Sequence, residues 1–245
     1  MLPGGLIDLL KDATEVVALT GAGVSAESGV PTFRDAQTGL WSRYRAEDLA
    51  TPAAFQRDPA LVWNWYAWRR SLVEGVKPNP AHLALATLEQ RLPGFHLITQ
   101  NVDGLHFRAG SRKVLALHGD LFLTLCSAEK TPVETWRDDG EAPPRCPRCD
   151  APLRPGVVWF GETLPQDVLS KVLALSAVSQ VFLSIGTSAL VQPAASLARM
   201  AYESGAVVVE INPEATPLSD IAHFVLRGPA GEIIPALLEI AWPAG

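Results

Sequence analysis

Short apolar runs recur along this chain, and each one leads into a loop of small or polar residues. The runs cover residues 16–19, 95–99, 114–117, 181–185 and 207–211. Helical patterns separate several of them, at residues 80–92, 164–179 and 193–204. Strands that alternate with helices indicate a parallel sheet with helices on both faces. We therefore expect an α/β fold with a doubly wound parallel sheet, in which the loops after the strands converge on one crevice.

Two segments interrupt this alternation. Residues 36–79 are rich in Trp, Arg and Pro and indicate an irregular helical module, whereas residues 121–160 hold all three cysteines and are rich in Pro and Gly. We expect them to form a smaller inserted lobe, part helical and part similar to a zinc ribbon. The predicted division leaves residues 1–35, 80–120 and 161–245 to a Rossmann-like domain.

Charge and cysteine content exclude several classes of protein. A net charge of −6 and an isoelectric point near 5.4 argue against general binding to nucleic acid or anionic membranes. The first residues carry no basic segment of the signal-peptide type, and no run of 18 apolar residues predicts a membrane span. An odd number of cysteines, three, is unlike a secreted disulfide framework. We expect a cytoplasmic protein.

The loop after the first apolar run has the composition of a dinucleotide site. Residues 19–35 read LTGAGVSAESGVPTFRD, and Gly21, Gly23 and Ala26 have the G-x-G-x-x-A spacing. Glycines at such positions let the backbone approach a phosphate. A dehydrogenase would continue with a helix and a second strand that leads to an acidic residue about 20 positions on. Here the chain continues as a loop, which indicates a site that covers the dinucleotide and acts on it.

Six sequence blocks carry a family resemblance. They are GAGVSAESGVPTFRD at 21–35, TQNVDGLH at 99–106, HGD at 118–120, VVWFGE at 157–162, GTSALVQPA at 186–194 and INPE at 211–214. In this order they resemble the sirtuins, the NAD-dependent protein deacylases, and in particular bacterial members similar to the desuccinylase and demalonylase class. Because the blocks span nearly the whole chain, the resemblance is far more specific than a glycine motif alone.

The resemblance implies the reaction and its base. The substrate is an acyl-lysine protein or peptide, and NAD is a co-substrate that is consumed. Acetyl groups, and succinyl or malonyl groups, would leave lysine as O-acyl-ADP-ribose, with release of nicotinamide. His118 would act as the base that activates a ribose hydroxyl, because imidazole titrates near neutral pH. His106 is the rival histidine, and a buried structural role is the alternative for His118.

The NAD contacts follow from the same resemblance. They are expected at Gly21, Ala22, Gly23, Ser25, Glu27, Phe33, Arg34, Gln100, Asn101, Asp103, Gly186, Thr187, Ser188, Asn212, Pro213, Glu214 and Ala230. The amides of Ala22 and Gly23 would bind the pyrophosphate with the Ser25 hydroxyl. Phe33 and Arg34 would cover the nicotinamide. For each polar residue taken singly, a role as a turn or cap residue is the alternative.

Two further groups of residues concern the acylated peptide. Tyr66 and Arg69 are three apart in a helical segment, so they share a face and can bind a carboxylate. The alternative is an amphipathic helix that packs the small lobe, and Arg70 is the rival cation. The peptide is expected to add as a strand beside Val158, Phe160 and Gly161.

The sequence leaves open whether the cysteines bind a zinc ion. Cys146 and Cys149 form a C-x-x-C knuckle, with Cys126 twenty positions upstream. The resemblance implies two such pairs around a structural zinc, but Glu129 stands where the fourth cysteine is expected. Zinc accepts a carboxylate as fourth ligand, so Glu129 or Asp150 could complete the site, or the site could be weak or empty.

Two other functions compete with deacylation. One is a catalytically silent NAD or ADP-ribose sensor that keeps the fold, and the other is a mono-ADP-ribosyltransferase. The presence of His118, Asn101 and Asp103 argues against a silent protein.

Overall fold

Six parallel strands form the central sheet of the computed structural model, which describes residues 3–32, 43–137 and 140–243. The strands are β1 (Val16–Thr20), β2 (Phe95–Thr99), β3 (Val114–Ala116), β6 (Val181–Ile185), β7 (Val207–Ile211) and β8 (Phe224–Leu226). Their order is β3-β2-β1-β6-β7-β8, and every pair is parallel. The predicted parallel sheet is therefore confirmed. Because the strand order reverses between β1 and β6, the ligand crevice is expected at their carboxyl ends.

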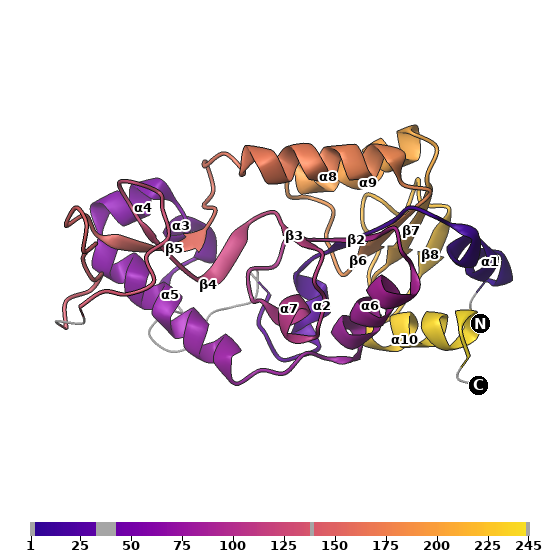
Figure 1. Cartoon of the computed structure of the whole chain (residues 1–245), viewed down its shortest axis with the longest axis horizontal. Coiled ribbons are helices and arrows are strands. Elements are labelled where there is room, and N and C mark those ends of the chain that lie inside the picture. Colours follow the sequence, from indigo (N-terminus) through magenta and orange to yellow (C-terminus); the bar gives the residue numbers. More distant parts are fainter. Residues whose placement is uncertain (1–2, 33–42, 138–139, 244–245) are drawn as a thin grey trace.

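Helices cover both faces of this sheet, as Figure 1 shows. One face packs against α1 (Gly4–Asp12), α6 (Pro80–Arg91) and α10 (Ala230–Ala241), and the other against α8 (Gln166–Val178) and α9 (Ala194–Glu203). Strand β1 shows how one strand serves both layers. Val16 and Ala18 belong to the first core, whereas Val17 and Leu19 belong to the second. Every residue of β1 is buried, as expected for a central parallel strand.

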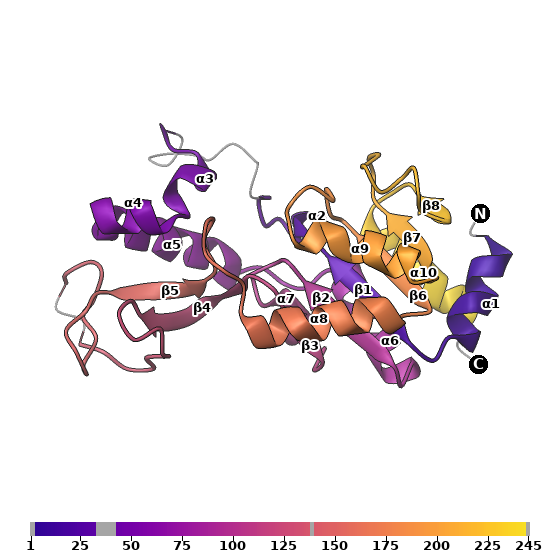
Figure 2. The same ribbon diagram turned by 90° about the horizontal axis from the view of Figure 1, so that it is seen from above.

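A smaller lobe extends from the carboxyl edge of the sheet (Figure 2). It contains α3 (Ala46–Leu49), α4 (Pro52–Arg57) and α5 (Pro59–Glu74), and the antiparallel strands β4 (Gly119–Cys126) and β5 (Leu153–Val157). Thr51 and Asp58 accept hydrogen bonds from the first turns of α4 and α5, and a proline follows each cap. These caps explain why a proline-rich segment still forms helices.

The two sheets meet at a short connection between β3 and β4. Leu117 and His118 make this connection, and Gly119, the first residue of β4, has a φ of +81°. A Cβ at Gly119 would also meet the carbonyl of Gly156 on β5. Only glycine satisfies both conditions without strain, so the residue after His118 turns the chain from one sheet into the other.

Two short helices, α2 (Ala22–Ala26) and α7 (Leu105–Arg108), are the first helices after β1 and β2 in the chain. In the described part of the chain, no helix combines the length and the apolar character that crossing a bilayer requires. The division into two folding units stays a prediction.

Candidate functional site

A cavity of about 780 Å³ opens between the carboxyl ends of the sheet strands and the small lobe. This volume is typical of sites for small molecules and cofactors. The sequence-predicted residues in its lining are Gly21, Ala22, Gly23, Ser25, Tyr66, Arg69, Gln100, Asn101, Asp103, His118, Val158, Phe160, Gly161, Gly186, Thr187 and Ser188. The fold thus brings most of the predicted site into one space, from segments far apart in the sequence.

The two glycine loops of the site touch each other through their backbones. The amide of Gly21 donates to the carbonyl O of Ile185 at 3.0 Å. The amide of Gly23 donates to the carbonyl O of Gly186 at 2.8 Å. A Cβ at Gly23 would lie 2.7 Å from the Gly186 oxygen. The Gly23 amide therefore has a partner within the protein, and its contact with a pyrophosphate stays a prediction. These glycines are required where the loops meet.

Polar side chains behind the glycine loops hydrogen-bond to one another. The Ser25 hydroxyl donates to Asp103 Oδ2 at 2.7 Å and accepts from Asn101 Nδ2 at 3.0 Å. Gln100 Nε2 donates to Thr187 Oγ1 at 2.9 Å, which connects the loops after β2 and β6. The residues predicted to hold NAD therefore also hold one another in place.

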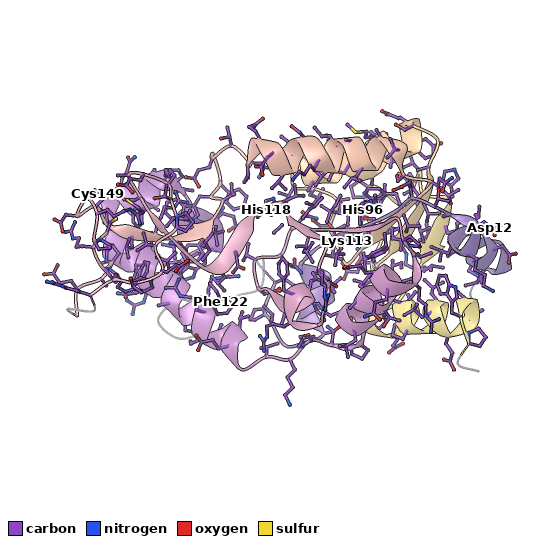
Figure 3. The ribbon with its side chains drawn as sticks, in the orientation of Figure 1. Asp12, His96, Lys113, His118, Phe122 and Cys149 are labelled. Carbon is purple, nitrogen blue, oxygen red and sulfur yellow. The ribbon has the colours of Figure 1, made fainter. Side chains whose placement is uncertain are left out.

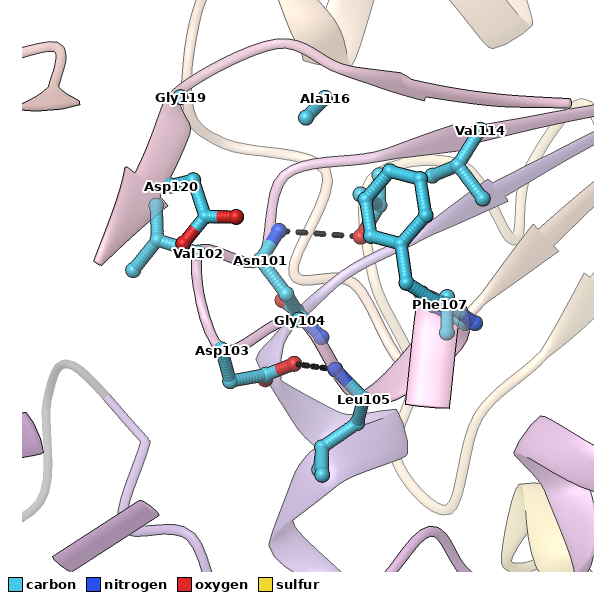
Figure 4. Close-up of a pocket in the computed structure, with 12 residues that line it drawn as sticks. Asn101, Val102, Asp103, Gly104, Leu105, Phe107, Val114, Ala116, Gly119 and Asp120 are labelled. Carbon is cyan, nitrogen blue, oxygen red and sulfur yellow. Dashed lines mark hydrogen bonds between the residues drawn. The ribbon is translucent and has the colours of Figure 1, made fainter. Parts of the chain in front are cut away.

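The loop that carries Asn101 and Asp103 is braced by its own side chains. The backbone amide of Asn101 donates to Thr99 Oγ1 at 3.1 Å, and Asp103 Oδ1 accepts from the backbone amide of Leu105 at 2.9 Å (Figure 4). A second cavity of only about 10 Å³ adjoins this loop and reaches β3, which is the lower limit for one water molecule. Burial raises the pKa of the Asp103 carboxyl, and the hydrogen bonds from Leu105 and Ser25 oppose this shift.

His118 lies between the two sheets and lines the large cavity (Figure 3). Its Nδ1 is 3.0 Å from the carbonyl O of Gln100. Because a carbonyl only accepts, Nδ1 carries the hydrogen and Nε2 keeps its lone pair. Burial lowers the pKa of His118 below 6.5, although the bond to Gln100 acts in the opposite direction. Burial therefore favours the neutral imidazole.

His106, the rival histidine, is not in the lining of the large cavity. His106 is buried with Nε2 2.9 Å from Thr20 Oγ1, and burial lowers its pKa to about 3. Its ring contacts that of His82, with centroids 4.8 Å apart. His82 closes a capping box with Asn79 at the start of α6. All five histidines are described, and His118 is the one in the lining of the large cavity.

The predicted acyl-binding pair lines the far side of the cavity. Tyr66 and Arg69 both face it from α5. Burial raises the pKa of Tyr66 far above its ordinary value, while the positive charge of Arg69 opposes the shift. Arg70 is not in this lining, because its guanidinium lies 4.8 Å from the centroid of the Trp63 ring. The helix therefore presents Arg69, and not its rival, to the cavity.

The segment predicted to bind the peptide forms the rim. The Val158 amide donates to the carbonyl O of His118, and the Phe160 amide to that of Ala50, each at 2.9 Å. Phe160 is 46% exposed, and Gly161 follows with a φ of +86°. These two amides are therefore engaged within the protein, and the addition of a peptide strand beside this segment stays a prediction.

Several residues predicted to contact NAD are outside this cavity lining. They are Glu27, Asn212, Pro213, Glu214 and Ala230. Two of them are tied to neighbouring loops: Asn212 Nδ2 donates to the Thr187 carbonyl O at 3.1 Å. The Glu27 carboxylate accepts from the Gly231 amide at 3.0 Å, at the start of α10. The structure thus brings these residues near the site without placing them in the cavity.

A buried ion pair organises the loop after β7, and the sequence reasoning missed it. Glu210, 1% exposed, accepts from Arg227 Nη1 at 2.8 Å and from Ser219 Oγ at 2.6 Å. Arg227 also donates to the carbonyl O of Glu214 at 2.8 Å. The available signal was an acidic residue within an otherwise apolar strand, since a buried carboxylate needs partners.

Two of the predicted NAD contacts, Phe33 and Arg34, lie outside the described residues. Trp159 was not singled out, yet it is buried in the lining, and its Nε1 donates to Tyr66 Oη at 3.1 Å. The two residues are 93 positions apart, so no local pattern connects them.

Comparison with known proteins agrees with this geometry. The model of the Sir2 family matches residues 21–193. The chain belongs to the Sir2 family. A Pseudomonas aeruginosa protein named NAD-dependent protein deacylase 1 is 51% identical over 246 residues, which cover 97% of this chain and 98% of the relative.

Solved Sir2 structures have the same fold. A Sir2 homologue in complex with NAD superimposes with a TM-score of 0.90 at 48% identity, covering 98% of this chain and 94% of the other. Sir2 with a p53 peptide and NAD+ gives a TM-score of 0.88 at 32% identity and covers all of both chains.

The three cysteines of this Sir2 protein meet in the small lobe, far from His118 (Figure 3). The Sγ atoms of Cys126, Cys146 and Cys149 all lie within 4.8 Å of one another, and all three thiols are free. Zinc–sulfur bonds of about 2.3 Å in a tetrahedron place sulfurs roughly 3.8 Å apart. The three thiols therefore fit as zinc ligands.

No fourth ligand joins them among the described residues. The Glu129 carboxylate accepts from Arg148 Nε at 2.9 Å and from Thr131 Oγ1 at 3.1 Å. These hydrogen bonds lower the pKa of Glu129. Asp150, the other possible ligand, is likewise not part of the cluster. The three cysteines would hold the metal, and a fourth ligand stays a prediction.

A fourth thiol at position 129 should strengthen the site. We expect Glu129→Cys to slow the loss of zinc to a chelator by about tenfold, because four thiolates complete the tetrahedron. Zinc release is measured with a colorimetric chelator after the protein is loaded with zinc. Glu134→Cys, which changes an exposed glutamate of the same lobe, is the control. Equal release rates for both variants would show that position 129 is outside the coordination shell.

Proposed function

We propose that this protein is an NAD-dependent protein-lysine deacylase. The observation that carries the proposal is the cavity in which a neutral, oriented His118 shares one wall with the loops after β1, β2 and β6. Membership of the Sir2 family and the names of close relatives support it. An acyl-lysine, NAD+ and water would yield free lysine, O-acyl-ADP-ribose and nicotinamide.

His118 is the general base of the proposed reaction. The Gln100 carbonyl holds the Nδ1–H and so leaves Nε2 to accept a proton. Its place in the cavity wall suits it to take that proton from a ribose hydroxyl of NAD. Burial keeps the imidazole neutral, so the base is ready at neutral pH.

The co-substrate occupies the part of the cavity nearest the sheet. Ala22, Ser25 and Ser188 line it beside the proposed pyrophosphate. Gln100, Asn101 and Asp103 lie where the nicotinamide and its ribose would bind, while Asn212 and Glu214 serve the adenosine ribose. Because hydrogen bonds among these residues fix their positions, little reorganisation is needed on binding.

The acyl group occupies the part of the cavity nearest the small lobe. Succinyl and malonyl groups end in a carboxylate, and Tyr66 with Arg69 offers a phenol and a guanidinium to it. Acetyl groups fit the same space without using these donors. The peptide lies along the rim at Val158, Phe160 and Gly161. A cytoplasmic location belongs to the same proposal and is supported by the three free thiols.

The activity is tested by incubating the protein with NAD and with acetyl- and succinyl-lysine peptides. We expect mass spectrometry to find deacylated peptide and O-acyl-ADP-ribose in equal amounts. His118→Gln should lower the rate at least about 100-fold, because it removes the base. His96→Gln, at the start of β2, is the matched control. Untouched NAD would indicate a sensor, and a peptide that gains ADP-ribose would indicate a transferase.

The pH profile should report the buried imidazole. Because burial lowers the pKa of His118, its neutral form persists below pH 6.5, and the acidic limb of kcat/KM should have its midpoint below that value. Rates on acetyl-lysine peptide are measured from about pH 5 to 8. The imidazole proton shifts, assigned with His118→Gln, give the pKa directly. A midpoint above 6.5 would contradict the assignment.

Acyl selectivity tests the Tyr66/Arg69 pair. Tyr66→Phe and Arg69→Met should each lower kcat/KM for the succinyl peptide by about 10- to 100-fold more than for the acetyl peptide, since charge-assisted hydrogen bonds are lost. Arg70→Met, the neighbouring cation outside the lining, should leave the ratio unchanged. An equal loss of both activities would rule out carboxylate recognition by this pair.

A further inference from the structure

We propose that Trp159 determines selectivity for acyl groups that end in a carboxylate, by orienting the hydroxyl of Tyr66. This inference rests on the proposed deacylase function and concerns the same cavity. Trp159 acts as a positioning residue, because it works through Tyr66.

The donor and acceptor roles at this contact are determined by chemistry. Trp159 Nε1–H lies 3.1 Å from Tyr66 Oη, and an indole nitrogen can only donate. Tyr66 Oη must therefore accept this bond. The Tyr66 O–H can therefore donate to a different acceptor. Tyr66 lines the large cavity, so a ligand carboxylate there can receive that proton.

Both partners are rigid. Tyr66 is 2% exposed and Trp159 is 3% exposed, and both belong to the same hydrophobic core. Phe55 contacts the Trp159 ring at a centroid distance of 5.2 Å, and Trp65 contacts the Tyr66 ring at 4.6 Å. Side chains held in this way lose little entropy when a ligand binds, so the hydroxyl is oriented in advance.

A buried cation also contacts the Trp159 ring. The guanidinium of Arg154 lies 3.5 Å from the centroid of the Trp159 ring, and Arg154 is 3% exposed. Glu162 binds this guanidinium at 2.6 and 2.8 Å and also accepts from the Trp159 amide at 2.9 Å. A cation over an aromatic ring withdraws electron density, so the indole N–H becomes a stronger donor.

Orientation of the Tyr66 hydroxyl should affect acyl groups differently, because they differ in whether their end accepts a hydrogen bond. A succinyl or malonyl carboxylate is a charged acceptor for the Tyr66 hydroxyl, close to the positive charge of Arg69. The methyl of an acetyl group accepts no hydrogen bond. A Tyr66 hydroxyl that donates into the cavity therefore favours acyl chains with a carboxylate, and loss of its orientation should show mainly with those chains.

The test compares wild type with Trp159→Phe, which keeps an aromatic ring and removes the N–H. We expect the ratio of kcat/KM for succinyl- over acetyl-lysine peptide to fall about 5- to 10-fold, mainly through a higher KM for the succinyl peptide. Trp63→Phe makes the same change in the same lobe but outside the cavity lining, so its ratio should equal that of wild type. An unchanged ratio in Trp159→Phe overturns the inference.

A double-mutant cycle separates this role from simple packing. In a Tyr66→Phe background, Trp159→Phe should lower the ratio no further, because the hydroxyl that it orients is gone. Independent, additive losses would overturn the inference. If Trp159→Phe does not fold, benzothienylalanine at position 159 keeps the shape of the indole without the N–H, and the same ratio decides.

The proposed function and this inference fail in different ways. A wild-type protein that removes no acyl group refutes the deacylase proposal. A wild type that removes acetyl but not succinyl groups overturns the role of Trp159 and leaves the deacylase proposal intact.

Discussion

Backbone contact between two glycine turns sets the position of the whole cleft. The amides of Gly21 and Gly23 donate to the carbonyls of Ile185 and Gly186, and any side chain at these positions would collide with that loop. The strand order reverses at this contact, so the loops diverge on either side of it and leave a crevice. The other cavity walls are arranged around this point.

Buried polar groups then give that crevice its chemistry. Ser25, Asn101 and Asp103 satisfy one another by hydrogen bonds, so the crevice can hold polar groups without leaving them unpaired. His118 is held by a backbone carbonyl and is kept neutral by burial. A base of this kind suits removal of a proton at neutral pH. The small lobe adds the aromatic wall around Tyr66 and Trp159, where acyl groups would be distinguished.

Much of the fold could be predicted because its signals are local. The apolar runs at β1, β2, β6 and β7 are short and fully apolar or nearly so, and the structure has strands at each of them. The location of the candidate site could be predicted for a related reason, because the loops after parallel strands gather at one edge of the sheet. Distant pairings were harder to predict. The antiparallel pairing of β4 with β5 joins residues separated by a long cysteine-containing segment, and nothing local specifies that register.

The sequence by itself determined the type of sheet and the order of the site loops, which follow from periodicity and from small residues at turns. Its resemblance to the sirtuins, together with side-chain chemistry, indicated candidates for the base and the carboxylate receptor. Tertiary structure decided which of two neighbouring cations faces the cavity, Arg69 or Arg70, and which histidine lines it. It also decided that the Gly23 amide is occupied and that Trp159 holds Tyr66. These outcomes depend on contacts between segments far apart in the chain, and such contacts exist only in the folded protein.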